Sequence, residues 1–254
     1  MNSGNRRYSE ILQKLTTQLI LGIDIMSDKQ QEATPDISAF LASAIHDMKN
    51  SISILIKFLN SSITELDPEA QRRAAPMLYE AQRVNDNLIQ MLAIYKVGNQ
   101  FYPFDLTENS IGDFVQGVVE QNESLLDYLG IELKLDFDED MTWYFDRELV
   151  TGVISHALGN ASRYNKGKLR LSVKEEDGDL VMRVEDNGSG FPASVIEAGD
   201  AVRKGVNFSS GGTGLGLYFS SMVAKLHKNR GKTGSMSLEN GGEYGGGCFV
   251  MRLP

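Results

Sequence analysis

Hydrophobic positions in two neighbouring stretches of the chain follow a heptad rhythm. Between residues 41 and 59, and again between residues 77 and 95, apolar positions are spaced alternately four and three residues apart. This spacing places the apolar side chains on one narrow stripe of an α-helix, as in bundles and coiled coils. The members are Leu41, Ile45, Met48, Ile52, Leu55 and Leu59, then Met77, Ala81, Val84, Leu88, Met91 and Tyr95.

A turn separates these two helices. Asp67 is a suitable N-cap residue and Pro68 a suitable first helical residue, so a new helix is predicted to begin there. Two long amphipathic helices joined by a short turn form an antiparallel hairpin. One hairpin alone leaves part of its apolar stripe in water, so two hairpins are expected to pair into a four-helix bundle. The pattern therefore predicts a homodimer.

The segments before and after this hairpin lack its heptad spacing and predict other elements. Residues 7–26 are predicted to be helical, and residues 27–36 read as a linker. After residue 98, helices and strands alternate, which predicts an α+β sandwich with a largely antiparallel sheet. The predicted helices cover residues 107–129, 146–162 and 213–228, and the predicted strands lie at 131–137, within 168–186 around an Asp-Gly turn, and at 246–254. The predicted domains are residues 1–35 (helix and linker), 36–98 (helical hairpin) and 99–254 (α+β).

Composition narrows the class of protein. The 254 residues carry a formal net charge of −9, which argues against nucleic-acid binding because that function needs a basic surface. The single cysteine excludes an internal disulfide and favours a reducing compartment. No apolar run approaches the ~20 residues of a membrane span, and no signal peptide is recognised. We therefore expect a cytoplasmic protein without membrane insertion.

The stretch "SAIHDMKNSI" at residues 43–52 contains the first candidate for chemistry. His46 follows the apolar stripe by one position, so it is predicted to point away from the bundle. Asn50, four residues later, shares that outer face, and Asp47 is adjacent in sequence. These residues alone leave two interpretations open, a solvated surface histidine and a reactive one.

Two glycine-containing stretches are candidates for ligand binding. In "VEDNGSGFP" (184–192), Asp186 ends a predicted strand and is positioned to accept a hydrogen bond from an exocyclic amine, although Asp-Asn-Gly also forms ordinary turns. "SSGGTGLGLYFSSMVAKLH" (209–227) is a glycine-rich loop that leads into a helix, where backbone N–H groups favour phosphates. A flexible loop before a helix is the alternative. The spacing does not match a Walker A sequence.

A third candidate lies on the predicted helix at residues 146–162 and just beyond it. Asn160 and Arg163 are three residues apart and share one side. An amide oxygen can bind Mg²⁺ and a guanidinium can bind a phosphate. Taken singly, both residue types are more common as plain helix surface.

The chain carries an asparagine-bearing helix, then Asp-x-Gly-x-Gly, then Gly-x-Gly-x-Gly. This order of motifs resembles that of one nucleotide-binding fold. It is the GHKL or Bergerat fold, shared by sensor histidine kinases, Hsp90 chaperones, type II topoisomerases and MutL ATPases. Within that group, "FLASAIHDMKNSI" (40–52) resembles the H-box of the histidine kinases, and "FYPFDL" (101–106) resembles the segment that enters their catalytic domain. The resemblance covers residues 36–254. It implies a dimerisation and phosphotransfer hairpin followed by a GHKL-type α/β sandwich that binds ATP.

The resemblance also implies residue roles. His46 would be the phosphoacceptor, Asp47 its general base, and Asn50 the residue that positions water for dephosphorylation of a response regulator. Asn160 would bind Mg²⁺. The other ATP-binding positions would be Arg163 and Tyr164, Asp186 at the adenine amine, and Gly188, Gly190, Gly212, Thr213, Gly214, Leu215 and Gly216 around the nucleotide lid.

Three positions depart from the family pattern. Ser51 stands where a proline is common after the H-box, and Phe208 is what remains of a phenylalanine-rich box. His156 replaces the first asparagine of the N-box, so it either offers a ring nitrogen near the metal or packs in the core. The departure at His156 leaves the affinity for Mg²⁺ open.

The sequence as a whole predicts a cytoplasmic, ATP-dependent protein histidine kinase of a two-component phosphorelay. Its cofactors would be ATP and Mg²⁺, and its partners a second copy, a response regulator receiver domain and a separate sensor protein. One alternative is a non-catalytic phosphotransfer or scaffold protein with a degenerate ATP domain. Another is a GHKL ATPase that acts through conformational change, but such proteins lack an H-box and have a glutamate where His156 stands.

Overall fold

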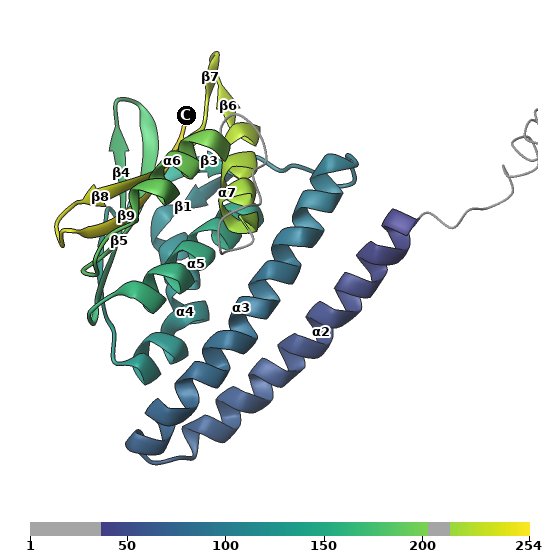
Figure 1. Ribbon diagram of the computed structural model, residues 1–254. Coiled ribbons are helices and arrows are strands. Elements are labelled where there is room, and N and C mark those ends of the chain that lie inside the picture. Colours follow the sequence, from purple (N-terminus) through teal and green to yellow (C-terminus); the bar gives the residue numbers. More distant parts are fainter. Residues whose placement is uncertain (1–36, 203–213) are drawn as a thin grey trace, which may run out of the picture. The chain divides into compact units, whose positions relative to one another are not determined.

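The computed structural model describes residues 37–202 and 214–254 (Figure 1). The chain divides into two compact units, residues 1–44 and 45–254. In the first unit, the described residues form the start of helix α2 (Ile37–Thr64). The helix predicted at residues 7–26 and the linker predicted at residues 27–36 lie outside the described residues.

The two predicted long helices are confirmed. Helix α3 (Pro68–Gly98) begins at the predicted turn, where the Asp67 carboxylate accepts hydrogen bonds from the backbone N–H groups of Glu69 and Ala70 at 3.0 and 2.9 Å. Pro68 occupies the first helical position, where its missing N–H costs no intrahelical hydrogen bond.

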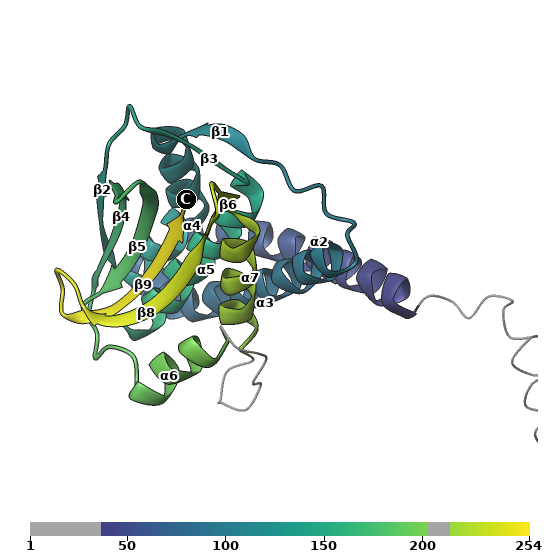
Figure 2. The ribbon, with the colours of Figure 1, turned by 90° about the horizontal axis from the view of Figure 1, so that it is seen from above.

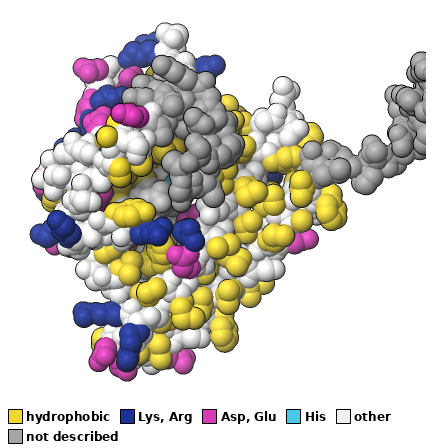
Figure 3. Space-filling view, in the orientation of Figure 1, with side chains coloured by type: hydrophobic (Ala, Val, Ile, Leu, Met, Phe, Trp, Pro, Cys, Tyr) yellow, Lys and Arg dark blue, Asp and Glu magenta, His cyan; other side chains and the backbone are white. Residues whose placement is uncertain are grey.

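Half of each apolar stripe is exposed. Along α2 and α3, stripe residues that are partly buried alternate with exposed ones, so the exposed residues recur every seven positions. Figure 3 shows hydrophobic side chains gathered along α2 on the face in view. The exposed stripe residues are Leu41, Met48 and Leu55 on α2, and Met77, Val84 and Met91 on α3.

The α+β fold predicted for the rest of the chain is confirmed. Its main sheet has five strands in the order β2-β4-β5-β9-β8, with β2 parallel to β4 and the other pairs antiparallel. The strands are β2 (Glu132–Phe137), β4 (Lys168–Glu176), β5 (Asp179–Asp186), β8 (Ser235–Gly241) and β9 (Gly246–Leu253). The predicted Asp-Gly turn joins β4 to β5, and both Asp177 and Gly178 have positive φ, as a tight hairpin turn requires.

Helices cover one face of this sheet (Figure 2). They are α4 (Ile111–Leu129), α5 (Arg147–Tyr164), α6 (Ala193–Val202) and α7 (Leu215–Leu226). Between helices and sheet lies one hydrophobic core, and burial of each of its large side chains contributes ~1.5–3 kcal/mol. The largest fully buried side chains include Phe114, Phe145, Phe219, Ile154, Leu158, Leu169, Leu171, Met182 and Met251. Short strands β6 (Lys228–Asn229) and β7 (Lys232–Thr233) form a separate hairpin after α7.

One predicted helix boundary is wrong. Residues 107–129 were expected to be helical throughout, but Thr107–Ser110 forms strand β1, paired with β3 (Thr142–Phe145). The hydroxyl of Ser110 then caps α4 by accepting a hydrogen bond from the backbone N–H of Asp113 at 3.2 Å. The pairing partner is more than 30 residues away in sequence, so local periodicity could not indicate it. Among the described helices, none is long and apolar enough to cross a membrane.

Candidate functional site

His46 lies on the outer surface of α2, as predicted. Its side chain is 59% exposed, and both neighbours that the sequence singled out approach the same ring nitrogen. His46 Nδ1 lies 3.4 Å from an Asp47 carboxylate oxygen and 3.4 Å from the Asn50 amide nitrogen. The described hydrogen bonds of His46 stay within α2. The structure therefore brings His46, Asp47 and Asn50 together, but places none of them in hydrogen-bonding contact with Asn160 or Asp186.

This arrangement distinguishes the two nitrogens of the imidazole. The Asp47 carboxylate only accepts hydrogen bonds, whereas the Asn50 amide nitrogen only donates them. A half-turn of the Asn50 amide places its oxygen at the ring, and both neighbours then favour a proton on Nδ1. Nε2 then keeps its lone pair and makes no hydrogen bond with the described residues. Ser51 stands where the family commonly has proline, and α2 continues through it without a break. Its hydroxyl donates a hydrogen bond to the backbone carbonyl of Asp47 at 3.0 Å.

The Asp186 carboxylate lies at the end of β5 with glycines close around it. Its side chain is almost fully buried, and Oδ1 accepts a hydrogen bond from the Gly188 backbone N–H at 2.7 Å. A Cβ atom at Gly188 would lie 2.1 Å from the Tyr164 carbonyl oxygen, so only glycine fits there. A Cβ atom at Gly247 would lie 2.8 Å from Asp186 Oδ2, so a larger residue would displace the carboxylate. Oδ2 makes no hydrogen bond with the described residues, so it has capacity for a ligand donor.

The described part of the glycine-rich loop ends in an open helix N-terminus. Gly214 is the N-cap of α7 with φ of 61°, a conformation that favours glycine, and no described side chain caps this helix. The first N–H groups of α7, from Leu215 onward, therefore have no side-chain acceptor among the described residues, which suits an anion. Gly212 and Thr213 lie outside the described residues. Gly190, at the other glycine stretch, also has positive φ (77°).

His156 and Asn160 face each other on α5. The Asn160 amide nitrogen lies 2.9 Å from His156 Nε2. The imidazole packs against the start of α7 so closely that a Cβ atom at Gly216 would lie 1.8 Å from Nε2. Burial lowers the pKa of His156 to about 4, so the ring is neutral near pH 7.

Arg163 and Tyr164 end the same helix. The Arg163 guanidinium lies 5.4 Å from the centre of the Tyr164 ring, within the range of a cation–π contact. The Tyr164 side chain is 61% exposed. Both side chains are therefore accessible to a ligand that approaches the end of α5.

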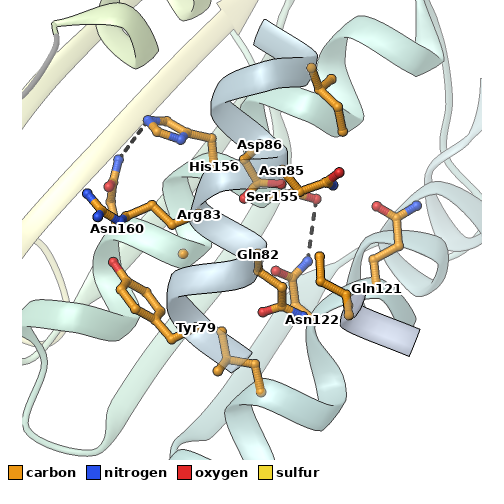
Figure 4. A pocket seen from close by; sticks show the side chains of 14 residues that line it. Tyr79, Gln82, Arg83, Asn85, Asp86, Gln121, Asn122, Ser155, His156 and Asn160 are labelled. Atoms are coloured by element: carbon orange, nitrogen blue, oxygen red, sulfur yellow. Dashed lines mark hydrogen bonds between the residues drawn. The ribbon is translucent and has the colours of Figure 1, made fainter. Parts of the chain in front are cut away.

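A cavity of about 300 Å³ opens beside Asn160 and extends to α3 (Figure 4). Sequence analysis assigned α3 to dimerisation alone and missed its lining residues Tyr79, Arg83 and Asp86. Burial raises the pKa of Asp86 to about 6, and Asp86 pairs with no described residue. A signal was present, because Tyr79, Arg83, Asp86 and the buried Gln90 repeat the spacing 4, 3, 4 as a second stripe on α3.

A buried hydrogen-bond network that the sequence did not indicate joins the "FYPFDL" segment to α5. The carboxylate of Asp146, the N-cap of α5, accepts hydrogen bonds from the Tyr102 hydroxyl and the Leu149 N–H at 3.0 Å each, and from the Asp105 N–H at 3.1 Å. Burial, together with the bond to Asp146, raises the pKa of Tyr102. The network orients the helix that carries His156 and Asn160.

His227 extends this network to the end of α7. Its Nε2 accepts a hydrogen bond from the Asp146 N–H at 3.0 Å, and its Nδ1 lies 2.8 Å from the Val223 carbonyl oxygen. A carbonyl only accepts, so Nδ1 carries the proton and the ring is neutral. Phe104 packs edge-on against the ring at 5.1 Å between centroids. Burial lowers the pKa of His227.

Comparisons with known proteins agree with this geometry. Residues 145–254 match the family described as histidine kinase-, DNA gyrase B-, and HSP90-like ATPase. Sensor protein SrrB of Staphylococcus aureus (strain N315) is 24% identical over 226 residues, which cover 85% of this chain and 37% of SrrB. The chain thus spans a little over a third of the length of the curated relatives it matches.

Solved structures show the same fold. Full-length ShkA in complex with AMPPNP has a TM-score of 0.58 at 21% identity, over 87% of this chain and 46% of ShkA. Acinetobacter baumannii histidine kinase AdeS has a TM-score of 0.52 at 20% identity, over 82% and 96%. The catalytic domain of histidine kinase ThkA has a TM-score of 0.50 at 20% identity, over 59% and 95%.

Proposed function

Because residues 145–254 match the histidine kinase-, DNA gyrase B-, and HSP90-like ATPase family and the chain is similar to a sensor protein, we propose that it is an ATP-dependent protein histidine kinase. His46 takes the γ-phosphoryl group of ATP and passes it to an aspartate of a response regulator. The observation that carries this proposal is the exposed imidazole of His46, with Asp47 and Asn50 both at one ring nitrogen. Residues 36–98 act as the phosphotransfer and dimerisation domain, and residues 99–254 bind ATP.

The chemistry follows from the two ring nitrogens. The free lone pair on His46 Nε2 attacks the γ-phosphorus, a P–N bond forms, the bond to the β–γ bridging oxygen breaks, and ADP leaves. The imidazole becomes positively charged, and its Nδ1 proton passes to the Asp47 carboxylate. Such a transfer needs alignment and charge neutralisation more than covalent help. Exposure of His46 on α2 leaves it accessible to an ATP domain and to an acceptor protein.

The donor groups at the ATP site fit the nucleotide. Asp186 Oδ2 has spare acceptor capacity for the adenine amine, and the start of α7 suits the phosphates. Arg163 supplies an exposed positive charge at the end of α5. The amide oxygen of Asn160 is a suitable ligand for Mg²⁺, which would neutralise phosphate charge. Gly188, Gly190, Gly214 and Gly216 keep backbone close to the nucleotide.

A second candidate function is histidine phosphotransfer without ATP turnover. It is favoured by the hydrogen bond between the Asn160 amide nitrogen and His156, because that bond fixes the direction in which the amide oxygen points. Such a protein would accept a phosphoryl group on His46 from another phosphoprotein. It would bind ATP weakly or not at all.

Nucleotide binding tests the ATP domain. Titration calorimetry with Mg-ATP should show binding, and Asp186→Asn should weaken it at least tenfold because an amide presents a donor as well as an acceptor to the adenine amine. Asp179→Asn, at the other end of the same strand, is the matched control and should leave affinity unchanged. Equal affinity in the wild type and Asp186→Asn would refute the role of Asp186.

Two variants on one helix face separate kinase from phosphatase activity. With γ-labelled ATP, His46→Ala should abolish acid-labile label because no nucleophile remains. Asn50→Ala should keep most self-phosphorylation but slow dephosphorylation of the regulator, because the amide that orients water is lost. Lys57→Ala, exposed further along α2, is the control and should change neither activity. Label that survives in His46→Ala would place the phosphoacceptor elsewhere.

A further inference from the structure

The unusual residue of the ATP site is His156, and its position suits a metal ligand. His156 and Asn160 are four residues apart on α5, so their side chains leave the helix on the same face. The imidazole Nε2 and the amide nitrogen are 2.9 Å apart. The nitrogen and oxygen of an amide are interchangeable by a half-turn of its plane, so Asn160 can present its oxygen at nearly the same place.

The 2.9 Å separation is that of the hydrogen bond between these two groups. It also equals the spacing of neighbouring donor atoms around an octahedral ion with metal–ligand bonds of about 2.0–2.1 Å at right angles. Shared binding of an ion would replace this hydrogen bond, with the Asn160 oxygen and His156 Nε2 both turned to the cavity of Figure 4 that they line.

The charge of the surrounding cavity also favours a cation. Arg83 is paired with Glu80, its Nε 2.9 Å from the carboxylate, so it adds little net charge. Asp86 lines the same cavity and pairs with no described residue, which leaves one carboxylate uncompensated. Among the described residues, no group of three or more His, Cys, Asp and Glu can hold a metal by itself. The remaining ligands must come from nucleotide phosphate and water.

Imidazole changes which metal such a site prefers. Mg²⁺ is bound by oxygen ligands, whereas imidazole nitrogen favours Fe²⁺, Co²⁺, Ni²⁺ and Zn²⁺. We propose that His156 and Asn160 together make the nucleotide site of this chain selective for a divalent transition metal over Mg²⁺. The inference rests on the proposed function, because the nucleotide supplies the other ligands.

Metal-dependent nucleotide binding tests this selectivity. The dissociation constant of AMP-PNP is measured by calorimetry with saturating Co²⁺, with saturating Mg²⁺ and with chelator. The wild type should bind Co-AMP-PNP at least tenfold more tightly than Mg-AMP-PNP. His156→Asn, which restores the amide common at this position, should reduce that ratio at least fivefold, mainly by weakening the Co²⁺ complex.

The visible absorption of bound Co²⁺ gives a second measurement that does not depend on activity. Its d–d bands should differ between the wild type and His156→Asn, because a nitrogen ligand is replaced by oxygen or water. Asp177→Asn removes an exposed carboxylate in the β4–β5 turn and should leave both the ratio and the spectrum unchanged. His156→Gln is the second variant if His156→Asn unfolds, as checked by circular dichroism.

The outcomes separate this inference from the proposed function. If AMP-PNP binds with neither metal, the proposed ATP site is wrong. If it binds and the Co²⁺ to Mg²⁺ ratio is equal in the wild type and His156→Asn, the inference is overturned, and His156 only packs against Gly216. A change of the same size in Asp177→Asn would also overturn it, because the Co²⁺ effect would then be nonspecific.

Discussion

At the scale of single residues, the contact between His156 and Gly216 is unusually close. A Cβ atom at Gly216 would lie 1.8 Å from the imidazole Nε2. We expect Gly216→Ala to lower the free energy of unfolding by about 1–3 kcal/mol, because the methyl group forces the ring or the start of α7 to move. Urea denaturation measures the change.

Two further variants make this prediction specific. Gly159→Ala, also on a helix but with nothing within 4 Å of its Cβ position, should gain about 0.5–1 kcal/mol from helix propensity. His156→Ala should remove most of the penalty when it is combined with Gly216→Ala, as a double-mutant cycle. If the penalty persists without the ring, it arises from the backbone of α7 and not from His156.

The buried His227 and the partly buried His156 make the free energy of unfolding depend on pH. Burial lowers the pKa of His227, and it lowers that of His156 to about 4, whereas an unfolded histidine titrates near about 6.5. Below pH ~6.5 the unfolded chain therefore binds protons that the folded protein does not. The contribution of the two neutral histidines to the free energy of unfolding is fully present above pH ~6.5. It is lost as pH falls through their pKa values in the folded protein.

Measured unfolding free energies at pH 7.5 and pH 5 test this dependence. The wild type should be less stable at pH 5, and the difference should shrink in His227→Gln, whose amide oxygen can still accept from the Asp146 N–H. His156→Asn should reduce it independently. An equal difference in all three proteins would show that carboxylates dominate the pH response in this range.

At the scale of elements, the segment before β1 is held by side chains rather than by secondary structure. Tyr102→Phe removes the hydroxyl that donates to the Asp146 carboxylate at 3.0 Å. Loss of a hydrogen bond to a charged group should lower the free energy of unfolding by about 1.5–3 kcal/mol. Tyr144→Phe, which alters an exposed tyrosine on β3, is the matched control and should change stability by less than about 0.5 kcal/mol.

At the scale of the whole molecule, the exposed heptad positions predict association of two copies. Leu41, Met48 and Leu55 are 46–55% exposed in the single chain. The stripe residues that alternate with them, Ile45, Ile52 and Leu59, are partly buried. A second hairpin would cover the exposed residues. We expect a dimer by light scattering at micromolar concentration, and a monomer for Leu55→Glu, because a charge in the bundle core is costly.

Lys57→Glu is the control for this variant, since it changes charge on the opposite side of α2. It should leave the dimer intact. A monomeric wild type, or equal dissociation in both variants, would contradict the four-helix bundle.

Much of the architecture was predictable because it depends on local patterns. Heptad spacing indicated α2 and α3, Asp67 and Pro68 indicated where α3 begins, and Asp177-Gly178 indicated the β4–β5 hairpin. The candidate site residues were found because their spacing within short segments resembles a known family. Such features need only neighbours within one or two turns, so the chain order alone carries them.

Tertiary structure decided what depends on distant neighbours. Strand β1 exists because Thr107–Ser110 meets β3, and Asp146 forms its network because Tyr102 and His227 are brought to it from positions 44 residues before and 81 residues after. Whether His156 packs against Gly216 likewise depended on where α7 lies. Sequence by itself determined the two long helices, the turn before α3, the β4–β5 turn and the candidate chemical groups. Their mutual distances, and hence their burial and pKa values, arise only when the core closes around them.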